Sequence, residues 1–325
     1  MAVQREDDAI LLHVSLHATS GSTVEFSIAW SKPTSRVAFP PEAHTLSRRE
    51  AWELLVESGC CRCEQLEISQ FTWPKSPPRN GAVRFVCISD THCKHNGLGA
   101  LPDGDVLVHA GDYTQHGRLH EIESFCKWFA SQPHARKILI AGNHELPLHA
   151  ASFERTAEEW SVDESERDPA TCDAARKLLA SIPNCDYLFE NGTEVHGVRV
   201  WGSPWQPVFG GAFNVARGPP IAAKWALIPE GIDVLLTHGP PLGHGDMLAT
   251  GRKREGCLDL LEAVSTRAEP PQLHVFGHIH EGYGMSTDGR TTFVNASSCT
   301  RRGQCTNAPI VVDVVPRWLA AIIEA

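Results

Sequence analysis

The chain has 325 residues, 42% of them hydrophobic, which is enough for a large core in one domain or in two smaller ones. Its formal net charge of −10 argues against a protein that binds long nucleic acids through their backbone, because such binding needs clustered Lys and Arg. The 11 cysteines are irregularly spaced, which is unlike a disulfide framework and typical of a reducing compartment, here expected to be the cytoplasm.

The first part of the chain differs in texture from the rest. We predict an N-terminal extension of residues 1–80, followed by one domain of residues 81–325. The chain begins with acidic residues ahead of a short apolar run, which is unlike a signal peptide. No apolar stretch approaches the ~18 residues of a membrane-spanning helix, so no membrane attachment is expected.

Within the extension, three segments have a recognisable pattern. Residues 9–30 contain two apolar runs around a Ser-Gly-Ser turn, which favours a pair of strands. Residues 47–58 have helical spacing and begin with a serine cap, whereas the prolines of residues 72–81 are typical of a linker. The three cysteines of residues 60–63 lack a second ligand pair at a zinc-type spacing, so free thiols are favoured over a metal site.

From residue 83 onward, short aliphatic runs alternate with amphipathic segments. The runs predict strands that are covered on both faces, at 83–88, 105–110, 137–141, 232–237 and 273–276. The amphipathic segments predict helices at 118–130, 172–182 and 256–267. An Asn-Gly pair predicts the turn of a hairpin within 187–201, and the C-terminal third favours further strands. These patterns together predict an α/β protein with large sheets.

Each of the five runs is followed by potential metal ligands. The clusters are Asp90-Thr91-His92, Gly111-Asp112, Gly142-Asn143-His144-Glu145, His238-Gly239 and Gly277-His278-Ile279-His280. Any one of them alone is commonplace in a loop, but five such clusters at five strand ends are an improbable coincidence. Because loops beyond the carboxyl ends of neighbouring strands open on one crevice, we expect a single site.

The residue types in these clusters suit a hard divalent cation. Carboxylate and amide oxygens together with neutral imidazoles are the ligands of Mn, Fe, Zn or Mg rather than of thiolate-loving metals. In an extended Asp-x-His segment, the side chains of Asp90 and His92 point to the same side and can reach one ion. The carboxylate of Asp112 can bridge two cations, and the neighbouring glycines let the backbone pass close to them.

The order D-x-H, G-D, G-N-H-E, H and G-H-x-H resembles the signature of the calcineurin-like metallophosphoesterases, over residues 83 to about 315. More narrowly, "RFVCISDTH" and "LHVFGHIHEGYG" resemble the metallophosphoesterase-domain-containing group. The resemblance implies a four-layer α/β/β/α sandwich of two mixed sheets flanked by helices. It also implies an enzyme with a dinuclear metal site, in which the bridging ligand is Asp112.

The ligands of the two ions follow from the same resemblance. The first ion is expected on Asp90, His92, Asp112 and His280, and the second on Asp112, Asn143, His238 and His278. Some members of the narrower group have a glycine at the position of His278. Because this chain has the histidine, its second site is expected to be complete. Mn is the favoured metal, with Fe, Zn, Mg and Co as alternatives.

The resemblance implies a phosphodiesterase for small phosphodiesters, with cyclic nucleotides, the 2′,3′-cyclic ones above all, as the favoured substrates. A hydroxide that bridges the metals is expected to attack phosphorus in line with the leaving oxygen. His144 is predicted to protonate that oxygen, although a purely structural histidine is the alternative. A catalytically weak scaffold that binds nucleotides or a partner protein is the alternative function, and no particular protein partner is predicted.

Other polar residues near the clusters are expected to play smaller parts. Glu145 is expected to cap the segment after it or to orient His144, and His109 to lie beside the site. Surface positions are expected for four further histidines, namely His95, His116, His149 and His244.

Substrate contacts are predicted from a loop rich in aromatic residues. Trp205, Phe213 and Asn214 could stack on and hydrogen-bond a nucleobase, although aromatic residues more often belong to the core. Arg217 and Arg301 are predicted as phosphate contacts. The sequence therefore predicts a small phosphodiester or nucleotide as the binding partner and no long nucleic acid.

Overall fold

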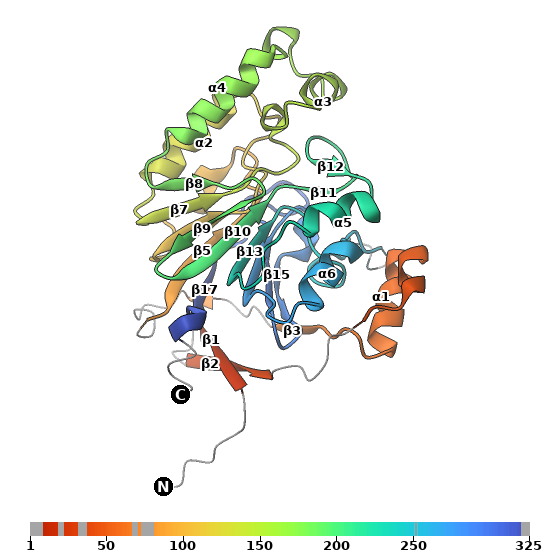
Figure 1. Cartoon of the computed structure of the whole chain (residues 1–325). Helices are drawn as coiled ribbons and strands as arrows, with labels where there is room; N and C mark the ends of the chain where they lie inside the picture. Colours follow the sequence, from red (N-terminus) through yellow and green to blue (C-terminus); the bar gives the residue numbers. More distant parts are fainter. Residues whose placement is uncertain are drawn as a thin grey trace.

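A computed structural model gives the fold of residues 9–18, 23–31, 38–66, 71–72, 81–249, 251 and 253–319, with side chains described from residue 38 onward except at 71–72 (Figure 1). Within this part of the chain, no helix is long and apolar enough to cross a membrane.

Two mixed sheets form the centre of the molecule. The first has the strand order β17 (Ile310–Val314), β5 (Val83–Ile88), β6 (Val106–His109), β7 (Arg136–Leu139) and β8 (Cys185–Tyr187). β17 is antiparallel to β5, and the other neighbours are parallel. Every residue of β5 and β6 is buried, as expected for aliphatic runs that are covered on both faces.

The second sheet has seven strands. In order they are β3 (Glu64–Leu66), β15 (Gly284–Thr287), β16 (Thr292–Asn295), β14 (Leu273–Phe276), β13 (Val234–Thr237), β10 (Val198–Ser203) and β9 (Asn191–Val195). The four central strands, β10, β13, β14 and β16, are parallel to one another. At the edges, β9 is antiparallel to β10, and β15 is antiparallel to both β16 and β3. The five strands predicted from aliphatic runs are all present, with ends that differ by two residues at most.

Helices cover the outer face of each sheet. α2 (Leu119–Ser131) and α4 (Pro169–Ala180) lie on the first sheet, and α5 (Pro219–Trp225) and α6 (Leu258–Ser265) on the second (Figure 1). These helices bury apolar stripes in one cluster with the outward side chains of the strands. The three predicted helices are confirmed, and the segment 172–182 begins three residues earlier than predicted, because Asp168 caps it.

Alternation along the strands separates two cores. In β5, Val86 and Ile88 face the helices, whereas Phe85 and Cys87 lie in the cluster between the sheets. The inner cluster also takes Val234 of β13 and further residues of both sheets. The layers are therefore helices, sheet, sheet, helices, and the expected four-layer architecture of two mixed sheets is confirmed.

The hairpin of β9 and β10 turns at a different place from the one predicted. Its register pairs Val195 with Val198, so the two turn residues are His196 and Gly197, with φ of 50° and 82°. The Asn-Gly pair lies inside β9 instead. The buried valines must face the core together, and this requirement outweighs the local turn preference of Asn-Gly.

The N-terminal segment contains the predicted strands and helix. β1 (Ala9–Ala18) pairs antiparallel with β2 (Thr23–Ser31), while the Ser-Gly-Ser turn lies outside the described residues. α1 (Arg48–Glu57) begins at Ser47, whose side chain forms a capping box with Glu50, so the predicted helix is confirmed. The predicted linker lies almost entirely outside the described residues.

α1 packs against the large domain. Trp52 and Leu55 form a cluster with Leu242, Leu258 and Leu261, and β3 is an edge strand of the seven-stranded sheet. Residues 38–66 are thus in extensive contact with the domain, and the predicted boundary at residue 80 stays a prediction.

The remaining elements are short. They are β4 (Phe71–Thr72), α3 (Phe153–Glu159), β11 (Gln206–Pro207), β12 (Asn214–Val215) and the 3-10 helices η1 (Pro41–Thr45), η2 (His95–Leu98), η3 (Leu146–Leu148), η4 (Glu164–Glu166) and η5 (His280–Gly282).

Candidate metal centre

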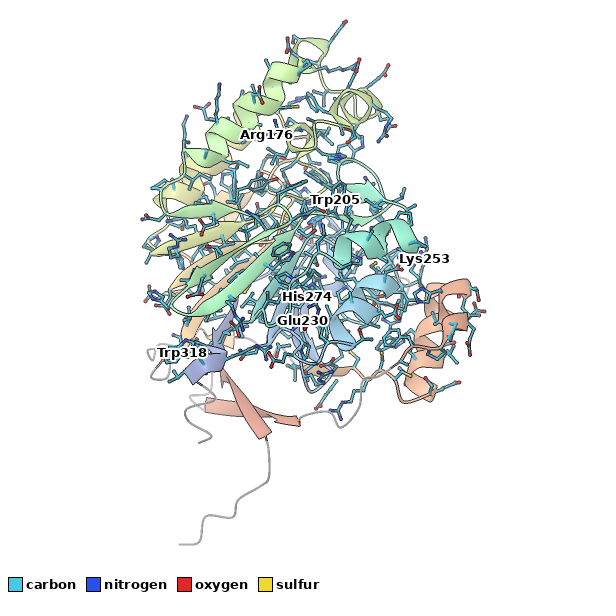
Figure 2. All side chains as sticks on the ribbon, in the orientation of Figure 1. Arg176, Trp205, Glu230, Lys253, His274 and Trp318 are labelled. Atoms are coloured by element: carbon cyan, nitrogen blue, oxygen red, sulfur yellow. The ribbon has the colours of Figure 1, made fainter. Side chains whose placement is uncertain are left out.

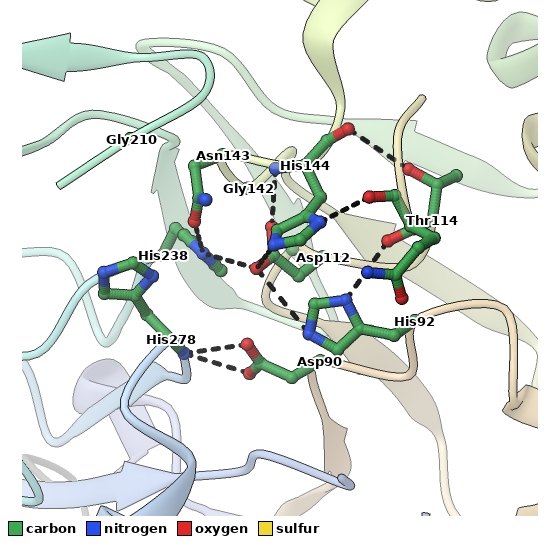
Figure 3. A network of polar contacts seen from close by, with 12 residues as sticks. Asp90, His92, Asp112, Thr114, Gly142, Asn143, His144, Gly210, His238 and His278 are labelled. Carbon is green, nitrogen blue, oxygen red and sulfur yellow. Dashed lines mark hydrogen bonds and ion pairs between the residues drawn. The ribbon is translucent and has the colours of Figure 1, made fainter. Parts of the chain in front are cut away.

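The polar clusters at the strand ends meet at one place. Their side chains form three groups of mutually close ligand atoms, which are Asp90, His92 and His280; His92, Asp112 and His144; and Asp112, His238 and His278. Figure 3 shows the side chains of Asp90, His92, Asp112, His144, His238 and His278 lying close together. The clusters come from loops that follow β5, β6 and β7 of one sheet and β13 and β14 of the other. Every residue predicted as a metal ligand lies here together with His144, including Asn143, whose amide oxygen is 3.0 Å from Nε2 of His238.

Asp112 lies at the centre of the groups. Its Oδ2 is 3.2 Å from Nε2 of His238, 3.8 Å from Nε2 of His144 and 3.9 Å from Nε2 of His92. Burial opposes the charge on this carboxylate, but the attraction of His238 and His144 holds its pKa well below the usual range. A buried carboxylate in the middle of three imidazoles is well placed to bridge two cations.

A second carboxylate marks one end of the site. Oδ1 of Asp90 is 3.3 Å from Nε2 of His280, and the Ser297 hydroxyl donates to Oδ2 at 2.9 Å. Burial lowers the pKa of His280, but the hydrogen bond and charge of Asp90 outweigh it and raise that pKa to about 9. In the same way, Asp112 overcomes burial and raises the pKa of His238 to about 9. The metal-free protein therefore holds protons where cations would bind.

Four of the imidazoles are oriented by backbone carbonyls. The pairs are His92 Nδ1 with the oxygen of Thr114 at 3.3 Å, His144 Nδ1 with Gln115 at 2.6 Å, His238 Nδ1 with Ala110 at 2.9 Å and His280 Nδ1 with Thr300 at 3.2 Å. A carbonyl only accepts, so each Nδ1 carries a hydrogen and each Nε2 faces the centre, where it can coordinate a cation once any proton on it has left.

This orientation tests whether the residues fit a metal ion. Nε2 of His92 and Nε2 of His280 are only 3.2 Å apart, and in the metal-free protein the proton on Nε2 of His280 lies among these two nitrogens and the Asp90 carboxylate. A divalent cation that both nitrogens coordinate could take the place of that proton, and the nearby Asp90 carboxylate supplies negative charge. The donor set of imidazole nitrogens and carboxylate oxygens fits a hard or borderline divalent ion.

The ligands occupy strained turns. Asp90, His92, Asp112 and His278 have φ of 50°, 43°, 56° and 68°, in the left-handed region that non-glycine residues rarely adopt. Such strain is concentrated at functional sites, where the surrounding structure sustains it. Gly142 is equally constrained, because a Cβ there would lie 2.2 Å from Oδ1 of Asp112. The close approach of backbone to ligands that the sequence predicts at this glycine is confirmed.

Glu145 ties two of the ligand loops together. Its fully buried carboxylate accepts the backbone N–H of Gly142 at 2.7 Å, of Asp112 at 2.9 Å and of Thr114 at 2.9 Å, and the Thr114 hydroxyl at 2.8 Å. Burial and the charge of Asp112 raise its pKa to about 7. The hydrogen bonds favour the structural role predicted for this residue, and they run to the loop backbone rather than to the ring of His144.

His109 lies directly behind the centre. It is fully buried, and its Nε2 is 3.0 Å from the hydroxyl of Thr91. Thr91 is the middle residue of the Asp90-Thr91-His92 segment. The ring of His109 packs edge-on against Tyr113 and Phe125. This agrees with the predicted position beside the site.

The ligands open on a cavity of about 630 Å³. Besides His92, Asp112, Asn143, His144, His278 and His280, its lining includes Lys94, Gln115, Phe209, Leu248, Glu281, Arg301 and Arg302. Phe209 is 57% exposed and its ring centroid lies 4.4 Å from that of His278. Arg301, which the sequence predicts as a phosphate contact, does line this cavity, although Nε of its guanidinium is also 3.4 Å from the Glu281 carboxylate.

The predicted nucleobase contacts are wrong. Trp205 and Phe213 are buried against each other, and Figure 2 shows Trp205 among packed side chains. The Asn214 amide is occupied within its own loop, where it donates to the carbonyl oxygens of Gly210 and Gly211. Phe209, which was not predicted, is the aromatic residue of this loop that reaches the cavity. The two glycines that follow Phe209, and its position outside any long apolar run, could have indicated an exposed aromatic residue in a loop.

Three other predictions are also wrong. Arg217 donates to the carbonyl oxygens of Glu255 and Gly256 and does not line the cavity. His95 and His244 are buried rather than on the surface, because aromatic rings cover them; His244 stacks on Phe293 with centroids 3.7 Å apart. His116 and His149 are half-buried.

Known proteins are similar to this chain over most of its length. The sequence model of the calcineurin-like phosphoesterase family matches residues 83–282. Metallophosphoesterase domain-containing protein 1 of Homo sapiens is 46% identical over 245 residues, which are 74% of this chain and 73% of the relative. A UPF0046 protein of Caenorhabditis elegans is 40% identical over 271 residues, or 82% of this chain and 91% of that protein. A solved structure from Thermus thermophilus has a TM-score of 0.43 and 14% identity, and the match covers 66% of this chain and 88% of that one.

Proposed function

Because the chain belongs to the calcineurin-like phosphoesterase family and is a metallophosphoesterase, we propose that it hydrolyses small phosphodiesters, with cyclic nucleotides, the 2′,3′-cyclic ones above all, as favoured substrates. The observation that carries the proposal is the convergence of five strand-end clusters on one centre, with imidazole Nε2 atoms and two carboxylates turned toward it.

Two divalent cations are part of this proposal. Asp90, His92, Asp112 and His280 would hold one, and Asp112, Asn143, His238 and His278 the other. When bound, the cations would neutralise charge on the phosphoryl oxygens and supply a nucleophilic water at neutral pH. Mn is proposed first, because a mixed set of oxygen and imidazole donors suits it, with Fe, Zn, Mg and Co as alternatives.

His144 is proposed to protonate the leaving oxygen. Its Nδ1–H is held by the carbonyl of Gln115 at 2.6 Å, so the ring is fixed while Nε2 faces the cavity beside Asp112. The rings of His92 and Trp160 flank it edge-on at 4.5 and 4.6 Å between centroids. A proton at Nε2 can therefore be presented to a substrate oxygen without any movement of the ring.

The walls of the cavity support a small anionic substrate with an aromatic group. The volume of about 630 Å³ falls within the range of small-molecule sites. Phe209 offers an exposed ring for stacking, while Lys94, Arg301 and Arg302 bring positive charge to a chain that is acidic as a whole. A mononucleotide combines both features, whereas the net charge of −10 disfavours long nucleic acids.

The proposal is tested by measuring metal content and Mn-dependent hydrolysis of a generic aryl phosphodiester. Asp112→Ala should lose both metal and turnover, whereas His144→Ala should keep the metal and lose turnover. A panel of monoesters and of 2′,3′- and 3′,5′-cyclic nucleotides then ranks substrates by kcat/KM. Metal-loaded protein that binds nucleotides but cleaves no diester would favour the scaffold alternative.

The cytoplasm is proposed as the compartment of the protein. All 11 cysteines are free thiols, and Cys93 is exposed, which suits a reducing environment. Fractionation of cells followed by immunodetection tests this, and recovery with secreted material would contradict it.

A further inference from the structure

A short hairpin between β16 and β17 carries one cysteine on each of its two arms. Cys299 and Cys305 face each other in an isolated antiparallel bridge. The turn between them is closed by the N–H of Thr300 bonded to the oxygen of Gln304 at 2.8 Å and by the N–H of Gly303 bonded to the oxygen of Thr300 at 2.7 Å. Directly opposed residues in an antiparallel pair have Cβ atoms about 4.5–5.5 Å apart, close to the separation that a disulfide requires.

The two thiols already interact and differ in environment. They are close enough for each to shift the pKa of the other, and the Cys299 sulfur also lies 3.7 Å from the carbonyl oxygen of Thr91. Cys299 is buried, whereas Cys305 is partly exposed. An attacking reagent from solution therefore meets Cys305 first, and Cys299 is placed behind it as the resolving thiol.

The charge distribution around Cys305 favours its reaction. The neighbouring Cys299 thiol lowers the pKa of Cys305, and the Lys94 ammonium lowers it further, although burial opposes both effects. Lys94 is held close by its hydrogen bond to the carbonyl oxygen of Gly303 at 2.6 Å. Since the thiolate is the nucleophile in thiol–disulfide exchange, Cys305 is the thiol that begins the reaction.

We propose that Cys299 and Cys305 are a modification site that forms an intramolecular disulfide by exchange with a small disulfide of the glutathione class. In the first step the Cys305 thiolate attacks the small disulfide, forms a mixed disulfide and releases one reduced thiol. In the second step the Cys299 sulfur attacks the Cys305 sulfur, and the proton of Cys299 passes to the departing thiolate, which leaves as the second reduced thiol. Two cysteine thiols are oxidised, one small disulfide is reduced to two thiols, and no other oxidant is needed.

The disulfide would constrain a segment that lines the cavity of the candidate metal centre. The hairpin contributes Arg301 and Arg302 to the cavity, and its Thr300 oxygen accepts from Nδ1 of His280. A covalent link across the hairpin limits the opening of the hydrogen bonds made by the amides of Thr300 and Gly303. Oxidation should therefore slow the hydrogen exchange of these two amides several-fold.

The test uses the full reduced chain, incubated with oxidised glutathione, alkylated and mapped by peptide mass spectrometry. The expected product is a peptide pair that links Cys299 to Cys305, together with slower exchange at Thr300 and Gly303. Cys93→Ser is the control for the exposed thiol and should form the bridge like the wild type. A wild-type protein that keeps glutathione on Cys305 without closing the bridge, or in which both thiols remain open to alkylation, would overturn the proposal.

Two variants separate the steps. Cys299→Ser should accumulate a stable glutathione adduct at Cys305 and show no slowing of exchange. Cys305→Ser, which changes the partly exposed residue and is the safer variant for folding, should give neither adduct nor bridge. Glutathione found on Cys299 in the Cys305→Ser protein would contradict the order of attack.

Discussion

Replacing Glu145 by Gln distinguishes a structural from a catalytic role for this fully buried acid beside the site. The amide can keep one oxygen toward Gly142 and Asp112 only if its NH2 group faces Thr114. The Thr114 hydroxyl can then accept from that NH2, but the Thr114 N–H loses its acceptor. One buried unsatisfied N–H costs about 1–3 kcal/mol, and the weakening of two charge-assisted hydrogen bonds brings the expected loss of unfolding free energy to about 2–4 kcal/mol.

The assay is urea unfolding of the metal-free protein, combined with kcat of the metal-loaded protein. Glu121→Gln is the matched control, because Glu121 also accepts two backbone N–H groups, from His116 and Arg118, but in a partly exposed position away from the centre. The control should lose less than half as much stability, since water can replace the lost acceptor there. Glu145→Gln with unchanged stability and abolished turnover would refute the structural role and make Glu145 a reacting group.

Four further predictions address other parts of the molecule. His144→Ala should bind metal as the wild type does and lose ~10²-fold or more in kcat for the aryl diester, and metal loss by elemental analysis would contradict it. Phe209→Ala should raise KM for nucleotides but leave KM for a small non-aromatic diester within error, because the exposed ring serves stacking. Trp52→Ala should lower the unfolding free energy by about 3 kcal/mol in urea titrations, since the ring is 9% exposed and packed in a core; a loss under about 1 kcal/mol would place α1 outside the folded unit. Burial lowers the pKa of His244 and of His274 to about 3, so both are neutral in the folded protein and take up protons only on unfolding. Their contribution to the unfolding free energy is complete above pH ~6.5 and decreases as the pH is lowered, by roughly 2 kcal/mol for each histidine between pH 7 and pH 5. An unfolding free energy of the metal-free protein that does not change over this range would refute the prediction.

The position of the candidate site was predictable because its signal is local. Each ligand cluster directly follows a short aliphatic run, and such a run has few alternatives to a buried strand. β5, for example, spans the same residues as its predicted strand. Once the strands are parallel neighbours, the geometry of the sheet itself brings Asp90, Asp112 and Asn143 to one edge.

Predictions failed where a residue's partners are distant in sequence. His244 is predicted at the surface, but it is covered by Phe293, far along the chain, and by Trp52 of α1. Trp205 and Phe213 form part of a core that also includes α5 and α6, so they are buried rather than exposed to a substrate. The residues next to these side chains in the sequence carry no information about such contacts. Tertiary packing decides whether the side chain of a loop residue is buried or exposed.

Neither sheet of the molecule can assemble the candidate metal centre alone. Asp90, His92, Asp112 and Asn143 follow strands of the five-stranded sheet, whereas His238, His278 and His280 follow strands of the other. His92 and His280 are 188 positions apart and nearly touch. An ion coordinated from both sheets would hold them together, so metal affinity and the packing of the two sheets would be thermodynamically coupled. A substitution deep between the sheets can therefore weaken metal binding without approaching any ligand.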